Sequence, residues 1–308
     1  MKIIYDIDDW ESSAVVATIG FFDGVHPGHR FLLREMIDIA GKKNLPSAVI
    51  TFPRHPRVVL NSDYQPKLLN SFDEKIDLLA KTGVDYVVVM DFTPELAALS
   101  AREFIKNILV AKVRVNTLLI GYDHRFGHLR AEGFEQYVSY GIDYGMDVIE
   151  ATSYSEKGQA VSSSTVRNLI SRGDVASASR LLGYQYRIKG HIVDGHKVGR
   201  TIGFPTANIA VDEKFKVIPH SGSYAIRIII DGKRYNGMLY IGPRPTLIDD
   251  DMISIETNIF DFSDEIYGKK VTVEFIEFIR EDIKFDSLAE LTEQMRIDKI
   301  KALEILNF

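Results

Sequence analysis

Apolar, β-rich runs alternate with amphipathic segments up to about residue 182. The runs cover residues 14–19, 48–52, 86–90, 117–120 and 146–150. The segments between them carry apolar side chains at helical spacing, in a helix that opens at Pro27 and in others at residues 73–81, 95–110 and 134–144. Strands that alternate with helices predict a parallel sheet with helices on both faces. Ligands of such sheets bind at the carboxyl ends of the strands.

After residue 183 the pattern becomes mostly β. Predicted strands cover residues 223–230, 233–241, 254–260 and 270–279, and Asp231-Gly232 is a hairpin signal. A final helix opens with Ser287 and Glu290, which are spaced as in a capping box. Its expected apolar face consists of Leu288, Leu291, Met295, Ala302 and Ile305. We therefore expect an α/β domain at residues 1–183 and an antiparallel β-barrel with a terminal helix at residues 184–308.

Composition narrows the class of protein. The chain has 308 residues, enough for two domains, with 45% hydrophobic and 26% charged residues, as in soluble globular proteins. Neither a membrane span nor a signal peptide is expected. Because cysteine is absent, disulfides, thiolate catalysis and cysteine metal sites are excluded, and a reducing cytoplasm is the expected location. A net charge of −6 without a dense basic run argues against nucleic acid as a partner.

Two histidines flank a glycine where the first run ends and the first helix begins. Backbone N–H groups at a helix start attract anions, and the imidazoles of His26 and His29 can add donors to a phosphate. Gly24 and Gly28 let the backbone approach a ligand closely. This arrangement suits in-line attack on phosphorus, which needs positioning and charge stabilisation rather than a protein nucleophile. Two histidines in this setting favour that interpretation over simple helix capping.

Three more segments could line the same site. Residues 162–167 (SSSTVR) place serine hydroxyls at a helix start, and Arg167 can bridge two phosphate oxygens. Residues 121–127 (GYDHRFG) and 51–56 (TFPRHP) each follow an apolar run. Taken alone, each segment fits a helix cap, a polar turn or a strand end equally well.

A glycine-spaced segment occupies residues 190–200 and runs into GFPTAN at residues 203–208. Bare backbone at glycines can cradle phosphates. Thr206 and Asn208 are two residues apart, so in an extended segment their oxygens point the same way, as shared Mg²⁺ ligands should. Glycine spacing alone would equally suit a turn-rich barrel connection.

The motifs taken together resemble a known family. GFFDGVHPGH at residues 20–29, GYDHRFG and SSSTVR look like the adenylyltransferase half of the bifunctional bacterial riboflavin kinase/FMN adenylyltransferase family, the prokaryotic FAD synthetases. The pattern G-x4-G-x3-GRxxGFPTAN at residues 190–208 is similar to the riboflavin kinase signature. The resemblance covers essentially the whole chain. It implies a Rossmann-like nucleotidyltransferase domain followed by a riboflavin kinase barrel.

The resemblance implies two reactions and a role for each motif. The riboflavin 5′-hydroxyl attacks the γ-phosphorus of ATP to give FMN, and FMN attacks the α-phosphorus of a second ATP to give FAD and pyrophosphate. Catalytic roles fall to His26, His29 and Glu256, the last as general base, and the Mg²⁺ ligands are Thr206 and Asn208. The implied ATP-binding residues of the adenylyltransferase are Gly20, Phe22, Asp23, Gly24, Gly28, Asp123, Ser163, Ser164 and Arg167. Those of the kinase are Gly190, Gly195, Lys197, Gly199, Arg200 and Gly203, and the flavin-binding residues are Phe52, His55 and Arg280.

Two residues depart from the family pattern, and three other functions stay open. Arg54 replaces a proline and His124 a phenylalanine, both near the FMN-adenylylating site. The alternatives are an enzyme with one lapsed site, another adenylyltransferase fused to an unrelated barrel, and a non-catalytic flavin- or RNA-binding regulator. The retained histidine pair, GFPTAN and Glu256 argue against all three. The expected partners are the small molecules ATP, riboflavin, FMN and FAD, with neither nucleic acid nor membrane.

Overall fold

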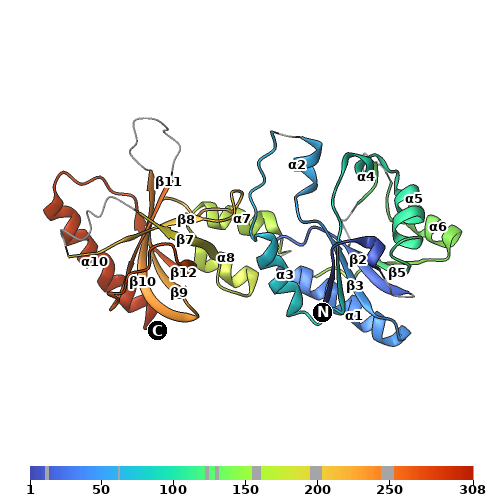
Figure 1. Ribbon diagram of the computed structural model, residues 1–308, viewed down its shortest axis with the longest axis horizontal. Helices are drawn as coiled ribbons and strands as arrows, with labels where there is room; N and C mark the ends of the chain where they lie inside the picture. The colour runs from blue at the N-terminus through green and yellow to red at the C-terminus, as the bar shows by residue number, and fades with distance from the viewer. Residues whose placement is uncertain are drawn as a thin grey trace. The chain divides into compact units, whose positions relative to one another are not determined.

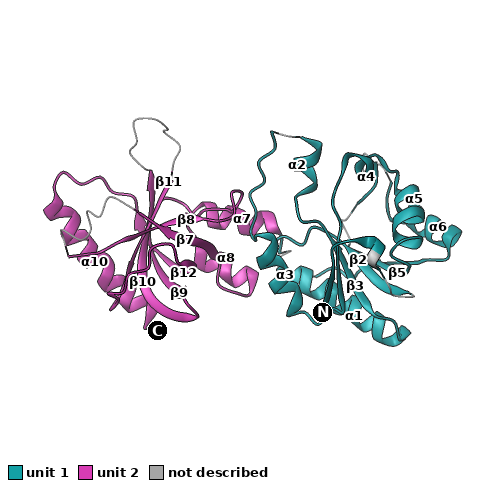
Figure 2. Ribbon diagram, viewed as in Figure 1, with its two compact units in different colours: residues 1–162 teal, residues 163–308 magenta. Residues whose placement is uncertain are grey.

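A computed structural model describes residues 1–10, 14–61, 63–121, 125–128, 132–154, 161–194, 203–243 and 253–307. They fall into two compact units, residues 1–162 and 163–308 (Figure 2). No helix in these ranges is long and apolar enough to cross a membrane.

The first unit contains a six-stranded, all-parallel sheet, which confirms the predicted class (Figure 1). Its strands are β1 Lys2–Ile4, β2 Val15–Ile19, β3 Ser47–Thr51, β4 Tyr86–Val89, β5 Val115–Ile120 and β6 Asp147–Glu150, in the order β1-β4-β3-β2-β5-β6. The three-residue edge strand β1 is too short to show a pattern and was not predicted. The chain proceeds outward from β2 through β3 and β4 on one side and through β5 and β6 on the other. The switch point, where such sheets bind ligands, therefore lies between β2 and β5.

Helices cover both faces of this sheet, as expected. On one face, α1 Pro27–Lys43 and α3 Phe72–Ala80 pack Leu33, Met36 and Leu79 against the strands. On the other, α5 Ala101–Phe104, the π-helical stretch η2 Ile105–Val110 and α6 Phe134–Tyr144 contribute Phe104, Leu109 and Tyr137. Short helices also form at η1 Ile7–Asp9, α2 Pro56–Leu60 and α4 Pro94–Ala98.

The single helix expected at residues 95–110 is broken. The chain forms α4, then an extended Leu99, then α5 and η2. Ser100 and Glu103 form a reciprocal capping box that begins the second segment. A capping box satisfies the first backbone N–H groups of a new helix, so it favours a fresh start over continuation.

The second unit contains a closed antiparallel barrel in the order β10-β11-β8-β7-β12-β9, which confirms the predicted architecture. Its strands are β7 Arg187–Val193, β8 Ala207–Val211, β9 Gly222–Ile230, β10 Lys233–Pro243, β11 Ile253–Ile259 and β12 Lys270–Glu281. Gly190, the first residue of the glycine-spaced segment, lies within β7. A Cβ atom there would collide with the carbonyl oxygen of Ala210 on β8, so its glycine is explained by close strand packing.

The helices in the described part of the second unit are α7 Ser163–Ser171, α8 Val175–Leu182 and α10 Leu288–Leu306. The backbone N–H of His220 donates to the Ile170 carbonyl at 3.3 Å, and Gly173 lies against the side chains of Tyr224 and Phe278. These contacts join α7 to the barrel unit. The expected domain boundary after residue 183 stays a proposal.

The terminal helix begins where the sequence predicts. The Ser287 hydroxyl accepts the Glu290 N–H at 3.2 Å, while the Glu290 carboxylate accepts the N–H of Asp286. Leu288, expected in the apolar face, is 57% exposed, whereas Ala302 is fully buried. Apolar periodicity shows which side of a helix is apolar, but it does not show how much of that side the barrel covers. The first turn of α10 is exposed to solvent.

Candidate active sites

A stacked histidine pair lies at the start of α1, directly after β2. His26 is the N-cap residue, and its backbone is extended. The His26 and His29 rings stack with centroids 3.7 Å apart, and Phe22 packs edge-on against His29 at 5.3 Å. A Cβ at Gly28 would come within 3.3 Å of the His26 ring, so glycine leaves the room that the stacked pair needs. The rings therefore lie at the N-terminus of a helix, a setting that favours an anion.

The turn that leads into α1 has unusual backbone. Phe22, Gly24 and Val25 have φ values of 55°, 85° and 36°, and the Val25 N–H donates to the Phe22 carbonyl at 3.2 Å. Left-handed conformations of residues other than glycine cost roughly 1–2 kcal/mol each. The surrounding packing maintains this strain, because Phe22 and Val25 are buried. Strained backbone of this kind is concentrated at ligand sites.

The charge state of His29 follows from its surroundings. Burial, then the neighbouring His26 and Lys75, hold the pKa of His29 well below its usual value of 6.5. Its Nδ1 is inaccessible to solvent and has no hydrogen-bond partner among the described residues. The ring is therefore neutral at pH 7, with one nitrogen as donor and the other as acceptor.

A second cluster of polar groups lies in the barrel and centres on Glu256. This residue, on β11, pairs with Asn208 on β8. The Thr206 hydroxyl donates to Glu256 Oε2 at 3.5 Å, and the Ser254 hydroxyl donates to Glu256 Oε1 at 3.0 Å. Ser254 Oγ also lies 3.4 Å from Asn208 Oδ1. Three residues singled out from the sequence thus form one cluster of oxygen atoms, with Ser254 between them.

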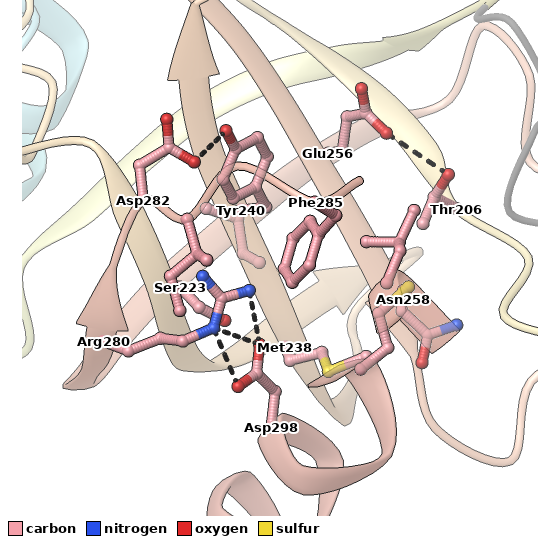
Figure 3. A pocket seen from close by; sticks show the side chains of 14 residues that line it. Thr206, Ser223, Met238, Tyr240, Glu256, Asn258, Arg280, Asp282, Phe285 and Asp298 are labelled. Atoms are coloured by element: carbon pink, nitrogen blue, oxygen red, sulfur yellow. Dashed lines mark hydrogen bonds and ion pairs between the residues drawn. The ribbon is translucent and has the colours of Figure 1, made fainter. Parts of the chain in front are cut away.

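Glu256 and Thr206 also line a cavity of about 260 Å³ (Figure 3). Its apolar wall consists of Met238, Leu239, Ile283, Phe285, Leu291 and Met295. Its polar lining consists of Thr206, Ser223, Tyr240, Glu256, Asn258, Arg280, Asp282 and Asp298. Such a cavity, largely apolar with a few converging polar groups, is typical of a small-molecule site.

Two pairs of polar side chains form part of the lining of this cavity. Arg280 Nε donates to both carboxylate oxygens of Asp298, at 3.0 and 2.9 Å, and the two side chains are 13% and 3% exposed. The Tyr240 hydroxyl donates to Asp282 Oδ1 at 2.7 Å (Figure 3). Burial, then the bond to Asp282, raises the pKa of Tyr240, so this residue remains a neutral phenol.

Comparison with known proteins decides the family. A family model for FAD synthetase matches residues 8–165, and one for riboflavin kinase matches residues 182–306. A bifunctional riboflavin kinase/FMN adenylyltransferase from Listeria monocytogenes is 38% identical over 305 residues, covering 97% of this chain and 96% of its own. The chain belongs to the bifunctional riboflavin kinase/FMN adenylyltransferase family. The Escherichia coli K12 member is 36% identical over 302 residues, covering 98% of this chain and 96% of its own.

A solved structure shares the fold over nearly the whole chain. A crystal structure described as a macrolide-efflux protein from Streptococcus pneumoniae matches with a TM-score of 0.86 and 30% identity, covering 96% of both chains. An experimentally determined structure therefore has the same fold as this chain.

Residues expected to bind flavin in the adenylyltransferase half of this family lie beside the histidine motif. Phe52, which directly follows β3, is buried, and the His55 ring packs edge-on against Phe21 at 4.9 Å. His55 Nδ1 also accepts the N–H of Arg57 and caps α2. Phe21 was missed by sequence reasoning, although its place inside the motif and its aromatic character were signals. Flavin binding by these residues stays a prediction.

The residues expected to bind ATP fall into three groups. Gly20 continues the pairing of β2 with β3, and Asp23 is 4% exposed, its carboxylate accepting the N–H groups of Leu69 and Asn70. Ser163, Ser164 and Arg167 occupy the first two turns of α7. In the kinase segment, Gly203 has a φ of 80°, a left-handed conformation that favours glycine. Asp123, Gly195, Lys197, Gly199 and Arg200 lie outside the described residues, as does His124, which was noted only as a departure from the family pattern. Their roles in ATP binding, and that of Gly190, stay predictions.

Sequence reasoning missed Ser254, which contacts Glu256, and Asp298, which lines the cavity. Ser254 is two residues before Glu256 on one strand, so the period-two rule could have placed both on one face. Asp298 could not have been found, because a lone acidic residue on a helix usually faces solvent. Only its contact with Arg280, on another element, shows its role.

Proposed function

We propose that this chain uses one ATP to phosphorylate riboflavin to FMN in the barrel and a second ATP to adenylylate FMN to FAD through the histidine motif. The observation that carries the proposal is that Glu256 and Thr206 lie on one cavity with an apolar wall (Figure 3). A flavin ring system suits the apolar wall, while its ribityl chain ends in a hydroxyl that needs a base. The family matches over both halves support each reaction.

In the kinase reaction, Glu256 accepts the proton of the riboflavin 5′-hydroxyl as that oxygen attacks the γ-phosphorus. The bond from the γ-phosphorus to the bridging oxygen breaks, and ADP leaves. Hydrogen bonds from Ser254 and Thr206 hold one oxygen each of the Glu256 carboxylate. A base whose orientation is fixed in advance loses less entropy in the transition state. Arg280, anchored by Asp298, forms part of the flavin wall.

Both reactions use ATP, and the oxygen cluster of the barrel suits Mg²⁺. Thr206 Oγ1 and Asn208 Oδ1 are hard oxygen donors, the kind that Mg²⁺ prefers, and both lie within the Glu256–Ser254 network. We assign these two residues as Mg²⁺ ligands. A Mg²⁺ ion held by Thr206 and Asn208 would neutralise phosphate charge during transfer of the γ-phosphoryl group.

In the adenylylation, a phosphate oxygen of FMN attacks the α-phosphorus of ATP, and pyrophosphate leaves. The FMN phosphate is already ionised, so this step needs no strong base. His26 and His29 at the start of α1 stabilise the charge that develops on the α-phosphate. Phe52 and His55 are assigned to the flavin. Asp123, Ser163, Ser164 and Arg167 are assigned to ATP on the strength of their motifs.

The proposal includes the domain boundary, the partners and the location. A boundary near residue 183 is supported by the family matches, because the FAD synthetase match ends at residue 165 and the riboflavin kinase match begins at residue 182. The partners are the small molecules ATP, riboflavin, FMN and FAD. We place the enzyme in the cytoplasm, where ATP for both reactions is available.

A direct assay tests the proposal. Purified full-length protein is incubated with riboflavin, ATP and Mg²⁺, and the flavins are separated by chromatography. We expect FMN to form first and FAD afterwards, and neither should form when ATP is omitted. Failure to form any FMN from riboflavin would refute the kinase assignment. Failure to convert added FMN to FAD would refute the adenylyltransferase assignment.

A further inference from the structure

A buried lysine outside all predicted motifs lies beneath the histidine motif. Lys75, on α3, is 3% exposed. Its ammonium group donates to the Phe52 carbonyl at 2.7 Å, the Phe21 carbonyl at 3.1 Å and the Thr51 hydroxyl at 3.2 Å. It also lies 4.2 Å from the centre of the Phe21 ring. Three oxygen acceptors thus surround the amino group, which offers three N–H donors when it is protonated and two when it is neutral.

The three acceptors belong to two segments that the adenylylation requires. Phe21 lies in the Gly20–His29 segment, two residues beyond the end of β2. Thr51 is the last residue of β3. Phe52 follows it and belongs to the segment assigned to flavin. The Thr51 hydroxyl also lies within hydrogen-bond distance of the Phe21 carbonyl, at 3.4 Å. Lys75 therefore joins the carboxyl ends of two adjacent strands at the edge where the sheet binds ligands.

A second interaction also connects the histidine motif with α3, and here the side chain comes from the motif. The carboxylate of Asp23 accepts the backbone N–H groups of Leu69 at 3.0 Å and Asn70 at 3.2 Å. These residues directly precede Ser71, which caps α3. The histidine motif therefore holds the start of α3 through Asp23, and α3 holds the motif through Lys75.

A purely structural role explains this lysine poorly. Burying an ammonium group costs several kcal/mol, and apolar side chains of similar size often give equal or greater stability. Burial also lowers the pKa of Lys75, with the Asp23 carboxylate opposing the change. The positive charge in turn helps to lower the pKa of His29. Lys75 is thus linked to the motif by geometry and by charge.

We propose that Lys75 is a positioning residue of the adenylyl-transfer site, which holds the histidine motif and the Thr51–His55 segment in fixed relation. This inference rests on the proposed adenylyltransferase function. A displacement of about 1 Å between reacting groups can lower a rate about 100-fold. Loss of the lysine should therefore lower kcat for adenylylation far more than it changes KM.

The test compares Lys75→Met with Lys81→Met, an exposed lysine at the end of the same helix. For Lys75→Met we expect kcat for conversion of FMN to FAD to fall about 30- to 100-fold, with KM for ATP changed less than about threefold. Riboflavin phosphorylation by the same protein should stay normal, as should both activities of Lys81→Met. A Lys75→Met protein with normal FMN-to-FAD kcat would overturn the proposal. If the wild-type protein forms no FAD, the proposed function itself fails.

A second variant covers the case in which Lys75→Met does not fold. Thr51→Val keeps the shape of the side chain and removes one of the three acceptors without leaving a charge unpaired. Its FMN-to-FAD kcat should fall about 3- to 10-fold, and the double variant should be no slower than Lys75→Met alone. A Thr51→Val protein with the wild-type kcat would also contradict the proposal.

Discussion

Glu256 can be tested without disturbing the shape of the barrel cavity. Glu256→Gln keeps the volume of the side chain and removes its ability to accept a proton. We expect FMN formation to fall about 100- to 10,000-fold, the contribution typical of a general base. Conversion of FMN to FAD should be unchanged. Both rates are measured by chromatography of the flavins.

An exposed glutamate on another barrel strand provides the control for that variant. Glu277→Gln, on β12, changes the same functional group at the surface and should leave both activities unchanged. If Glu256→Gln retained more than about a tenth of the kinase rate, another group would have to accept the proton.

Lys75 makes the free energy of unfolding of the first unit depend on pH, and the sign of this dependence follows from its pKa. Burial lowers its pKa from 10.5 to about 7, with Asp23 opposing the change. Below pH 7 the lysine is protonated in both the folded and the unfolded chain. Between pH 7 and 10.5 only the unfolded chain retains the proton, so the free energy of unfolding rises with pH across that window. His29, whose pKa is lowered from 6.5, stays neutral there when folded.

The measurement is the free energy of unfolding of the wild type minus that of Lys75→Met. We expect this difference to rise by on the order of 2 kcal/mol between pH 7 and pH 9. Trp10 reports on the first unit specifically, because it is the only tryptophan of the sequence and packs against Tyr86. A difference that is flat with pH would mean that the folded protein keeps Lys75 protonated throughout.

At the scale of the element, α1 contains two glycines with opposite expected behaviour. A Cβ at Gly28 would come within 3.3 Å of the His26 ring, whereas one at Gly41 would meet nothing within 4 Å. Gly28→Ala should displace His26 from His29 and lower FMN-to-FAD conversion at least about 10-fold. Gly41→Ala should leave activity unchanged and stabilise the helix by roughly 0.5–1 kcal/mol.

Kinetics and urea unfolding of the two alanine variants distinguish the site from the helix. The kinase rate is the internal control for both proteins. Equal effects of the two substitutions on adenylylation would show that α1 acts through its stability alone, and the stacked histidine pair would lose its assigned role.

At the scale of the whole molecule, the two activities should be separable and then recoverable. Glu256→Gln should lack only the kinase and His29→Ala only the adenylyltransferase. A mixture of the two proteins with riboflavin and ATP should therefore form FAD, because FMN released by one protein is adenylylated by the other. The measurement is FAD formed by the mixture against that formed by each protein alone. No FAD from a mixture in which each partner retains its own activity would show that FMN is not released.

The sequence by itself determined most of the elements and both motifs. Apolar spacing is a local property, so it located five of the six strands of the parallel sheet, and the hairpin turn at Asp231-Gly232 and the start of α10 followed from local turn and capping rules. The histidine motif at residues 20–29 and the GFPTAN segment at residues 203–208 are each a continuous stretch of chain. Their chemistry could therefore be inferred from the local sequence. Where local signals compete, as at Ser100, the same approach predicted one helix and the chain forms several elements.

Only the tertiary structure decided which charges are buried together. Thr206 and Glu256 are 50 residues apart and meet because barrel closure pairs β8 with β11. Lys75 and Asp298 look in the sequence like ordinary polar helix residues, yet one holds two strand ends and the other anchors Arg280. Helical periodicity shows which residues share a face but not what that face meets. The groups that position the chemistry are therefore fixed by contacts between distant segments, which no local pattern records.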